Sequence, residues 1–356
     1  MIKRTLTCLL LAAASALAAD SPMQLPAGHP EMPHLSPTTM PAAAVGSLKI
    51  RVVQRTAQAP APAGDKVTVH FYQGEKVVKH SDVTVDAEGV ATVSDIALTR
   101  QAVQAMVMVH HGEITYQAMS RPMNSGMPTA EVEVSVYEST KDVPAWRIPM
   151  RHLIASQTPE GVRIVEMLAV DNPSDRTWTG TSEPEEGATL VLRLPAGATN
   201  LELGDGFSKE NVHFHNGTMM NLAPMTPGVA TYQFAYTVPV EGGKVHIPVI
   251  APVTTQQLMM FVPDDGTEIK TNGLQAAKET RKTQDGMMRM LSTAGLPAGQ
   301  TASLTILGVA DTVVAATPGK SWTVPQIMGA AGVGIVLVGG IAFMLLKPVK
   351  PQPGKK

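Results

Sequence analysis

Ala230-Thr-Tyr-Gln-Phe-Ala-Tyr-Thr-Val238 shows the clearest side-chain alternation in this chain of 356 residues. Because successive side chains of a strand point to opposite faces, Tyr232, Phe234 and Tyr236 are expected on one face. An amphipathic helix would instead repeat its apolar residues at intervals of three and four. The stretch therefore predicts a β-strand with one aromatic face buried in a core.

Further short strands are expected on both sides of this stretch. Trp146–Ile154 and Val162–Val170 are predicted to pair as a hairpin around Pro159-Glu-Gly161. Turn signals such as Gly242-Gly243 separate the later segments. The remaining expected strands are 189–194, 200–203, 244–247, 257–262 and 302–307. Short strands broken by such turns are typical of a sandwich, so residues 138–315 are predicted to form a large β-domain.

One segment of that domain is compatible with two kinds of secondary structure. Leu274–Lys282 could form a helix by intrinsic propensity, whereas Gly286–Leu291 could form another strand. We favour a mostly β structure with a polar loop for this piece.

A smaller β-domain is expected over residues 47–137. Val67, Val69 and Phe71 alternate with polar residues, and Asp86-Ala-Glu-Gly89 is a turn signal. The stretches Gly64–Gly74 and Thr84–Val93 resemble the transthyretin-like fold found in carboxypeptidase regulatory domains. The resemblance covers about a quarter of the chain. It implies a structural or adhesive domain rather than a catalytic one.

The larger domain has a resemblance of its own. The order of strands over residues 138–315 resembles an immunoglobulin-like sandwich placed before a C-terminal anchor in uncharacterised bacterial envelope proteins. The expected fold class is therefore all-β, with two β-sandwich domains, transthyretin-like and then immunoglobulin-like, plus one C-terminal transmembrane helix.

The two ends of the chain predict export and anchoring. Lys3 and Arg4 precede the apolar stretch Leu6–Leu17, which ends in small residues typical of signal-peptide cleavage. Ile327–Leu346 carries no charge, and about 20 apolar residues suffice to cross a bilayer as a helix. Lysines follow it at once, so the tail is expected to stay in the cytoplasm. We therefore expect a single-pass protein of a bacterial inner membrane with its body outside the cytoplasm.

The chain thus divides into seven expected segments. In order they are a signal peptide (1–19), a Pro/Met/His-rich flexible segment (20–46), the transthyretin-like sandwich (47–137), the larger sandwich (138–315), a stalk (316–326), the transmembrane helix (327–346) and a basic cytoplasmic tail (347–356).

Composition and motifs argue against several functions. With a net charge of −2, the chain lacks the excess of basic residues that is typical of nucleic-acid-binding proteins. The chain has no Gly-x-Ser-x-Gly elbow, no His-Glu-x-x-His motif and no Cys-x-x-Cys-His haem site. Its one cysteine, Cys8, lies within the expected signal peptide. We therefore expect no enzyme and no cofactor, except copper under the alternative below.

Methionine is the unusual component, with 21 residues against 4% aromatics. Thioethers can fill a core in place of aromatic rings, or they can bind copper(I) as soft ligands. His29, Met32 and His34 lie in the Pro-rich segment, which could wrap an ion or serve only as a solvated tether. Within the same segment, Leu25–Pro30 resembles a short motif of other bacterial envelope proteins, some encoded near cytochrome genes.

His213 and His215 form a second candidate metal site. Alternate residues of a strand share a face, so both imidazoles could converge on one ion. The other interpretation is two polar residues on a solvent-exposed face. A third ligand is required, and His246 or His152 could supply it if the fold brings one of them near.

Two functions follow from these observations. The first is a membrane-anchored extracytoplasmic module that binds or scaffolds an envelope protein partner, for which exposed strand edges are the default contact surface. The alternative is a periplasmic copper-binding protein linked to cytochrome assembly.

Overall fold

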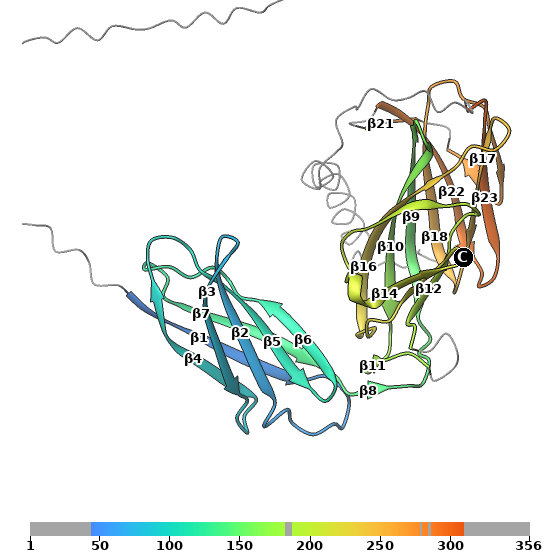
Figure 1. The fold of residues 1–356 in the computed structure, drawn as a ribbon. Helices are drawn as coiled ribbons and strands as arrows, with labels where there is room; N and C mark the ends of the chain where they lie inside the picture. Colours follow the sequence, from blue (N-terminus) through green and yellow to red (C-terminus); the bar gives the residue numbers. More distant parts are fainter. Residues whose placement is uncertain (1–43, 182–186, 278–279, 284–285, 310–356) are drawn as a thin grey trace, which may run out of the picture. The chain divides into compact units, whose positions relative to one another are not determined.

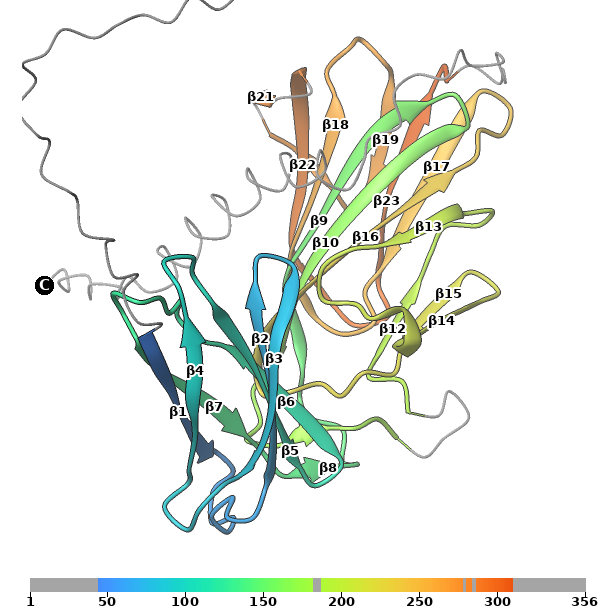
Figure 2. The same cartoon turned by 60° about the vertical axis from the view of Figure 1, so that its left-hand side comes forward.

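The computed structural model describes residues 44–181, 187–277, 280–283 and 286–309 (Figures 1 and 2). Within these ranges the chain is all-β, with strands β1 to β23 and one short 3-10 turn at Lys209–Asn211, so the expected all-β class is confirmed there. No helix of the described residues has the length and apolar character needed to cross a bilayer. The expected signal peptide, residues 20–43 and the expected span 327–346 lie outside the described ranges.

The first seven strands form two sheets around one core. The bounds are β1 Ala44–Gln54, β2 Lys66–Gln73, β3 Lys76–Thr84, β4 Val90–Leu98, β5 Gln104–His111, β6 Ile114–Met119 and β7 Thr129–Val136. One sheet has the order β4-β1-β7 and the other β3-β2-β5-β6. Val67, Val69 and Phe71 of β2 are fully buried against residues of the facing sheet, such as Ile50. The alternation expected for β2 is therefore confirmed.

Strand β1 begins earlier than the expected start at Ser47. Ala44, Val45 and Gly46 pair with the end of β4, which draws them from the flexible segment into the sheet. A Cβ atom at Gly46 would lie 2.6 Å from the carbonyl oxygen of Pro128. Glycine is needed there because the chain passes so close to its neighbour.

The later strands form a second body with its own core. Their bounds are β9 Arg147–Thr158, β10 Gly161–Asn172, β12 Leu190–Arg193, β13 Thr199–Leu203, β14 Val212–His215, β15 Thr218–Asn221, β16 Gly228–Val238, β17 Lys244–Ile250, β18 Thr255–Pro263, β19 Ile269–Asn272, β20 Gln275–Ala276, β21 Arg281–Thr283, β22 Gly286–Leu296 and β23 Thr301–Leu307. The largest sheet has the order β13-β16-β10-β9-β18-β22-β20, with β21 on β22. The sheets β12-β15-β14 and β17-β23-β19 share its core.

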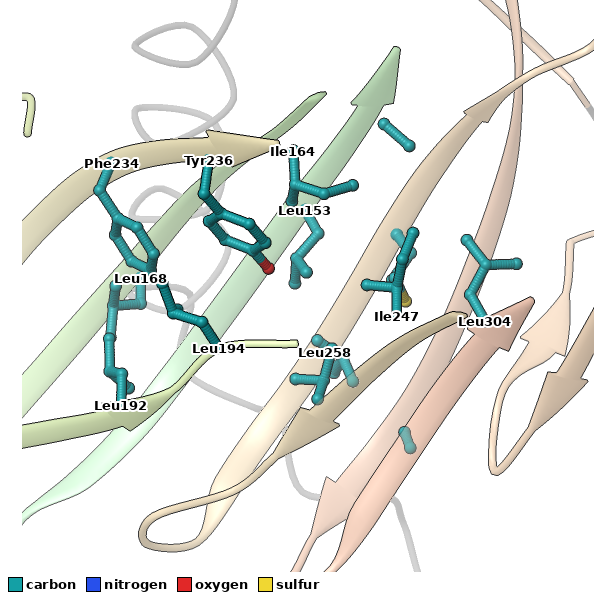
Figure 3. Close-up of a cluster of buried hydrophobic side chains, with 14 of the residues drawn as sticks. Leu153, Ile164, Leu168, Leu192, Leu194, Phe234, Tyr236, Ile247, Leu258 and Leu304 are labelled. Atoms are coloured by element: carbon teal, nitrogen blue, oxygen red, sulfur yellow. The ribbon is translucent and has the colours of Figure 1, made fainter. Parts of the chain in front are cut away.

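The aromatic strand lies where its alternation predicts. Tyr232, Phe234 and Tyr236 of β16 are 5%, 1% and 2% exposed. Figure 3 shows Phe234 and Tyr236 in one cluster with leucine and isoleucine side chains of β9, β10, β12, β17, β18 and β23. The expected hairpin is also confirmed, since β9 and β10 pair in antiparallel register around the turn before Gly161.

The described residues of the ambiguous piece are mostly β structure, as favoured. β22 pairs with β18 over most of its length, and β20 and β21 pair with β22 in turn. Leu291 thereby lies opposite Met260, and both side chains are buried in the core. Sheet pairing and burial outweigh the helix propensity of the polar residues before β22.

Candidate functional site

The structure describes only one of the two expected copper sites. His29, Met32 and His34 lie outside the described residues. His213 and His215 share one face of β14, and both are exposed. Their neighbours on β15 are Met220 and Thr218, respectively.

Neither of the expected third ligands joins that pair. His152 lies buried on β9, and His246 on β17 shares a hydrogen bond of 3.0 Å with the Thr305 hydroxyl. The described residues contain no group of three or more His, Cys, Asp or Glu placed to hold a metal ion. Beside the pair, His215 Nε2 lies 2.8 Å from the side-chain amide nitrogen of Asn216.

A different set of histidines and methionines gathers on the first body. The outer face of sheet β3-β2-β5-β6 carries one residue from each strand in a continuous cross-strand line: His80, His70, Met106 and Met119. We call these four residues the His-Met row. The ring centres of His70 and His80 are 4.9 Å apart. Two imidazoles that bind one ion at about 2.0–2.1 Å with tetrahedral angles have ring centres about 5 Å apart.

A carboxylate orients one end of this row. Asp82 Oδ2 lies 3.1 Å from His80 Nε2, and the Thr68 hydroxyl donates to Asp82 Oδ1 over 2.8 Å. The hydrogen bond from Thr68, followed by that from His80, lowers the pKa of Asp82. When Nε2 of His80 carries the proton and donates to Asp82, its Nδ1 keeps a free lone pair.

The same face is hollowed beside the row. An open hollow of about 420 Å³ is lined by Tyr72, Gly74, Ala102, Gln104, Met106, Met119 and Pro122. Met119 is 50% exposed, and Val77, which lies opposite Tyr72 on β3, is also exposed. An apolar, concave surface with a few polar groups is the usual form of a binding site.

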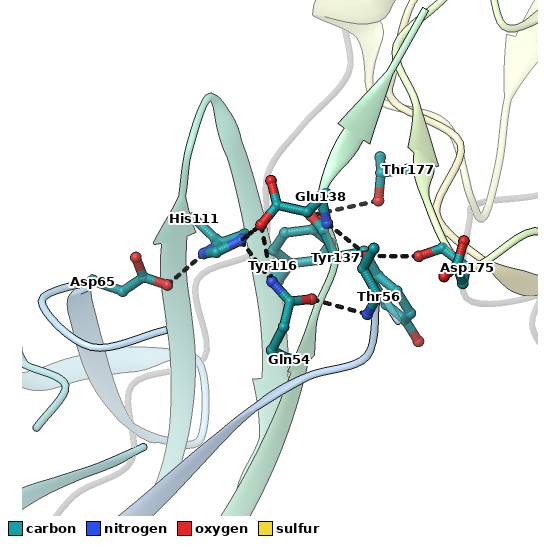
Figure 4. Close-up of polar contacts among 9 residues, drawn as sticks. All are labelled: Gln54, Thr56, Asp65, His111, Tyr116, Tyr137, Glu138, Asp175 and Thr177. Carbon is teal, nitrogen blue, oxygen red and sulfur yellow. Dashed lines mark hydrogen bonds and ion pairs between the residues drawn. The ribbon is translucent and has the colours of Figure 1, made fainter. Parts of the chain in front are cut away.

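A second polar cluster surrounds the connection between β7 and β9 (Figure 4). His111 Nδ1 lies 2.7 Å from Asp65 Oδ2, and His111 Nε2 lies 3.3 Å from Glu138 Oε1. Gln54 also donates to Glu138 Oε1 over 3.1 Å. Gln54 Nε2 also lies 3.1 Å from His111 Nε2. Because these hydrogen bonds occupy the nitrogen and oxygen atoms that could otherwise bind a ligand, we interpret the cluster as structural.

Hydrogen bonds continue from this cluster to the segment after β10. The Thr56 hydroxyl donates to the Asp175 carbonyl over 2.6 Å, and the Tyr116 and Thr177 hydroxyls are 2.7 Å apart (Figure 4). The short strands β8, Ser139–Thr140, and β11, Thr177–Trp178, pair in parallel. These contacts use backbone and hydroxyl groups, which suits a connection between elements rather than chemistry on a substrate.

The sequence alone predicts part of the His-Met row, namely the outward position of His70. The alternation of β2 places Thr68, His70 and Tyr72 opposite the buried valines, and therefore on the outer face. The neighbours of His70 depend on strand pairings that the alternation does not encode. For that reason the row was missed, whereas the shared face of His213 and His215 was predicted.

No protein-family model matches the chain, and no curated protein matches it. Among solved structures, the Legionella pneumophila aminopeptidase A in complex with aspartic acid is similar over 47% of this chain and 22% of its own, with 11% identity and a TM-score of 0.30. The full-length major pilin SpaD of Corynebacterium diphtheriae is similar over 70% of this chain and 80% of its own, with 9% identity and a TM-score of 0.21.

A DUF3823 family protein from Parabacteroides merdae is similar over 59% of this chain and 91% of its own, with 13% identity and a TM-score of 0.20. This chain therefore spans about a fifth of the aminopeptidase and most of the other two proteins. We draw no function from likenesses of this level.

Proposed function

We propose that this protein is a binding module of a bacterial cell envelope, anchored in the inner membrane by residues 327–346, which binds an envelope protein partner. The observation that carries the proposal is the hollow on the outer face of sheet β3-β2-β5-β6. Its lining combines Tyr72, Met106 and Met119 with the polar Gln104. Aromatic and methionine side chains are enriched where proteins bind one another.

The finer fold assignments belong to the same proposal. We assign β1–β7 to a transthyretin-like sandwich and β9–β23 to an immunoglobulin-like one. The first assignment is supported by two sheets of three and four strands around one core. A structural or adhesive role is what the resemblance implies for such a domain.

We propose binding rather than catalysis. The buried ion pair of Arg151 and Glu166 is 2% and 0% exposed, so a substrate would not reach it. His111 and Asp65, which contact each other, are hydrogen-bonded within the structural cluster, whereas the contact of His80 with Asp82 lies on the proposed binding face.

Site-specific crosslinking in cells tests the partner site. A photoreactive amino acid at Met119 is expected to give a discrete crosslinked species with one envelope protein. The matched control is Lys270, an exposed residue of β19 in the other body. Crosslinks of equal yield from both positions, or none from Met119, would contradict the proposal.

The proposed topology has its own test. Alkaline phosphatase is active only outside the cytoplasm, so a fusion after residue 315 is expected to be active and a fusion after Lys356 inactive. Activity of both fusions would place the tail outside and remove the proposed orientation.

Copper handling is the second candidate function. The specific observation in its favour is the spacing of 4.9 Å between the ring centres of His70 and His80, next to the thioether of Met106. Copper titration of the full chain is expected to show a site that weakens in the variant His70→Ala/His80→Ala. Binding that persists there but is lost in His213→Ala/His215→Ala or in His29→Ala/His34→Ala would move the site to those residues.

A further inference from the structure

A buried histidine of the second body has a ring nitrogen without a hydrogen-bond partner among the described residues. The neighbours of His152 on β9, Arg151 and Leu153, have their Cα partners on β10 in Leu168 and Glu166, which are core residues. The alternation of β9 therefore places His152 on the opposite face of the eight-stranded sheet. Even so, His152 is only 3% exposed, and its Nε2 has no hydrogen-bond partner within the described residues.

Such an atom needs an explanation, because buried polar atoms in folded proteins are almost always paired. Burial lowers the pKa of His152 to about 4, so the ring is neutral near pH 7. Its Nε2 is then either a lone pair or an N–H without a partner. A lone pair that faces no donor is what a metal ligand presents before the ion binds.

The register of the sheet places a thioether on each side of this ring. Met167 of β10 is the Cα partner of His152 on one side, and Met259 of β18 is its partner on the other. Directly opposite residues of neighbouring strands share a face, with Cβ atoms about 5 Å apart. Both methionines are half-buried. The ring of Phe261 packs edge-on against the imidazole at a centre-to-centre distance of 6.0 Å.

One imidazole nitrogen and two thioethers form a soft ligand set. Soft thioether ligands select copper(I), whereas hard cations prefer carboxylate and carbonyl oxygens. The described residues offer no carboxylate-rich alternative here, since no group of three or more His, Cys, Asp or Glu is placed to hold a metal. The neighbouring aromatic ring and the buried setting limit access of water to a bound ion.

We propose that His152, Met167 and Met259 form a copper(I) site on the outer face of the eight-stranded sheet. The site rests on the copper-handling function and is separate from the His-Met row of the first body. The ion is bound in the reduced state, and no electron transfer is part of the proposal.

Competition for copper(I) tests the site on the full chain in detergent, under anaerobic conditions and against a chromophoric copper(I) chelator. The informative variant is Met167→Leu/Met259→Leu, which removes both sulfur atoms and keeps the apolar volume. We expect copper(I) to bind this variant at least about tenfold more weakly than the wild type. Unchanged stoichiometry and affinity would overturn the proposal.

A matched control separates this site from the copper function as a whole. Met106→Leu/Met119→Leu removes two thioethers from the His-Met row and is expected to leave the proposed site intact. If copper(I) binding falls only in that control, the copper function stands and the His152 site fails. If the wild type takes up no copper(I), both fail.

Silver(I), a redox-stable substitute for copper(I), gives a readout at the ring itself. One equivalent is expected to shift the imidazole nitrogen resonance of His152, identified by its loss in His152→Phe. The same shift should be absent in Met167→Leu/Met259→Leu. A His152 resonance that silver(I) leaves unmoved would mean that the histidine is only a packed core residue.

Discussion

Arg151 and His152 are adjacent on β9, and both are buried, yet their surroundings differ. Arg151 donates to Glu166 Oε1 over 2.6 Å and to the Ile250 carbonyl over 2.9 Å. The Tyr236 hydroxyl donates to the other oxygen of Glu166 over 3.4 Å, and burial followed by the Glu166 charge raises the pKa of that tyrosine. The charged residue is thus paired on its face of the sheet, whereas Nε2 of the neutral ring, on the other face, has no hydrogen-bond partner within the described residues.

The buried ion pair gives a prediction for stability. Glu166→Leu leaves the Arg151 charge without its partner in the core, so the free energy of unfolding should fall by about 3–5 kcal/mol. The double variant Arg151→Met/Glu166→Leu removes both charges and should recover most of that loss. Urea unfolding of the three proteins measures the difference, and a double variant no more stable than the single one would contradict it.

The histidine gives a prediction for pH dependence in the metal-free protein. The pKa of His152 is about 4 when folded, below its ordinary value of 6.5, so the unfolded chain takes up the proton first. Stability is therefore complete above pH 6.5 and falls as the pH drops towards 4, by up to about 3 kcal/mol. His152→Leu should lack this part of the decline. Parallel pH profiles for the wild type and the variant would show that the ring is not held neutral by burial.

At the scale of elements, the local alternation of the sequence determines which side chains share a face of a strand, but it does not determine which strands pair. The alternation of β16 predicted its aromatic face, and the turn residues between β9 and β10 predicted the antiparallel pairing of these two strands. The parallel pairing of β9 with β18 joins His152 to Met259, residues distant in the sequence, and no turn or alternation encodes it. The His-Met row and the His152 site both depend on such pairings, which explains why the sequence predicted neither set of residues and offered His152 only as a third ligand for His213 and His215.

The β9–β10 turn provides a prediction at this scale. Gly161 has a φ of 141°, and a Cβ atom there would lie 2.2 Å from the carbonyl oxygen of Val238 on β16. Gly161→Ala should therefore destabilise the protein by about 2–4 kcal/mol. Gly242→Ala is the matched control, since Gly242 also has a positive φ, of 58°, but faces open space. Equal losses for the two variants, measured by thermal unfolding, would show that the contact with β16 is unimportant.

At the scale of the whole molecule, the described residues build two separate hydrophobic cores. One gathers the inward side chains of β1–β7 and the other those of β9–β23. Within the described ranges, hydrogen bonds near β8 and β11 join residues of the two bodies. Because residues that share one buried apolar core unfold together, each body is expected to unfold as a separate cooperative unit.

Core truncations test this independence by calorimetry. Phe71→Ala removes a ring from the first core and should lower the stability of one transition by about 3–5 kcal/mol. Ile164→Ala should lower the other transition by about 2–5 kcal/mol and leave the first in place. A single transition that both variants shift together would show that the polar contacts couple the two bodies.

The central claim is that the outer face of sheet β3-β2-β5-β6 binds an envelope protein. The most direct measurement is the crosslinking yield in cells from a photoreactive residue at Gln104, which lines the hollow, compared between the wild type and Met119→Glu. A carboxylate in an apolar contact surface is costly to desolvate, so the yield of the partner crosslink should fall at least about tenfold in the variant. A partner crosslink of unchanged yield, from a variant that accumulates normally, would contradict the claim.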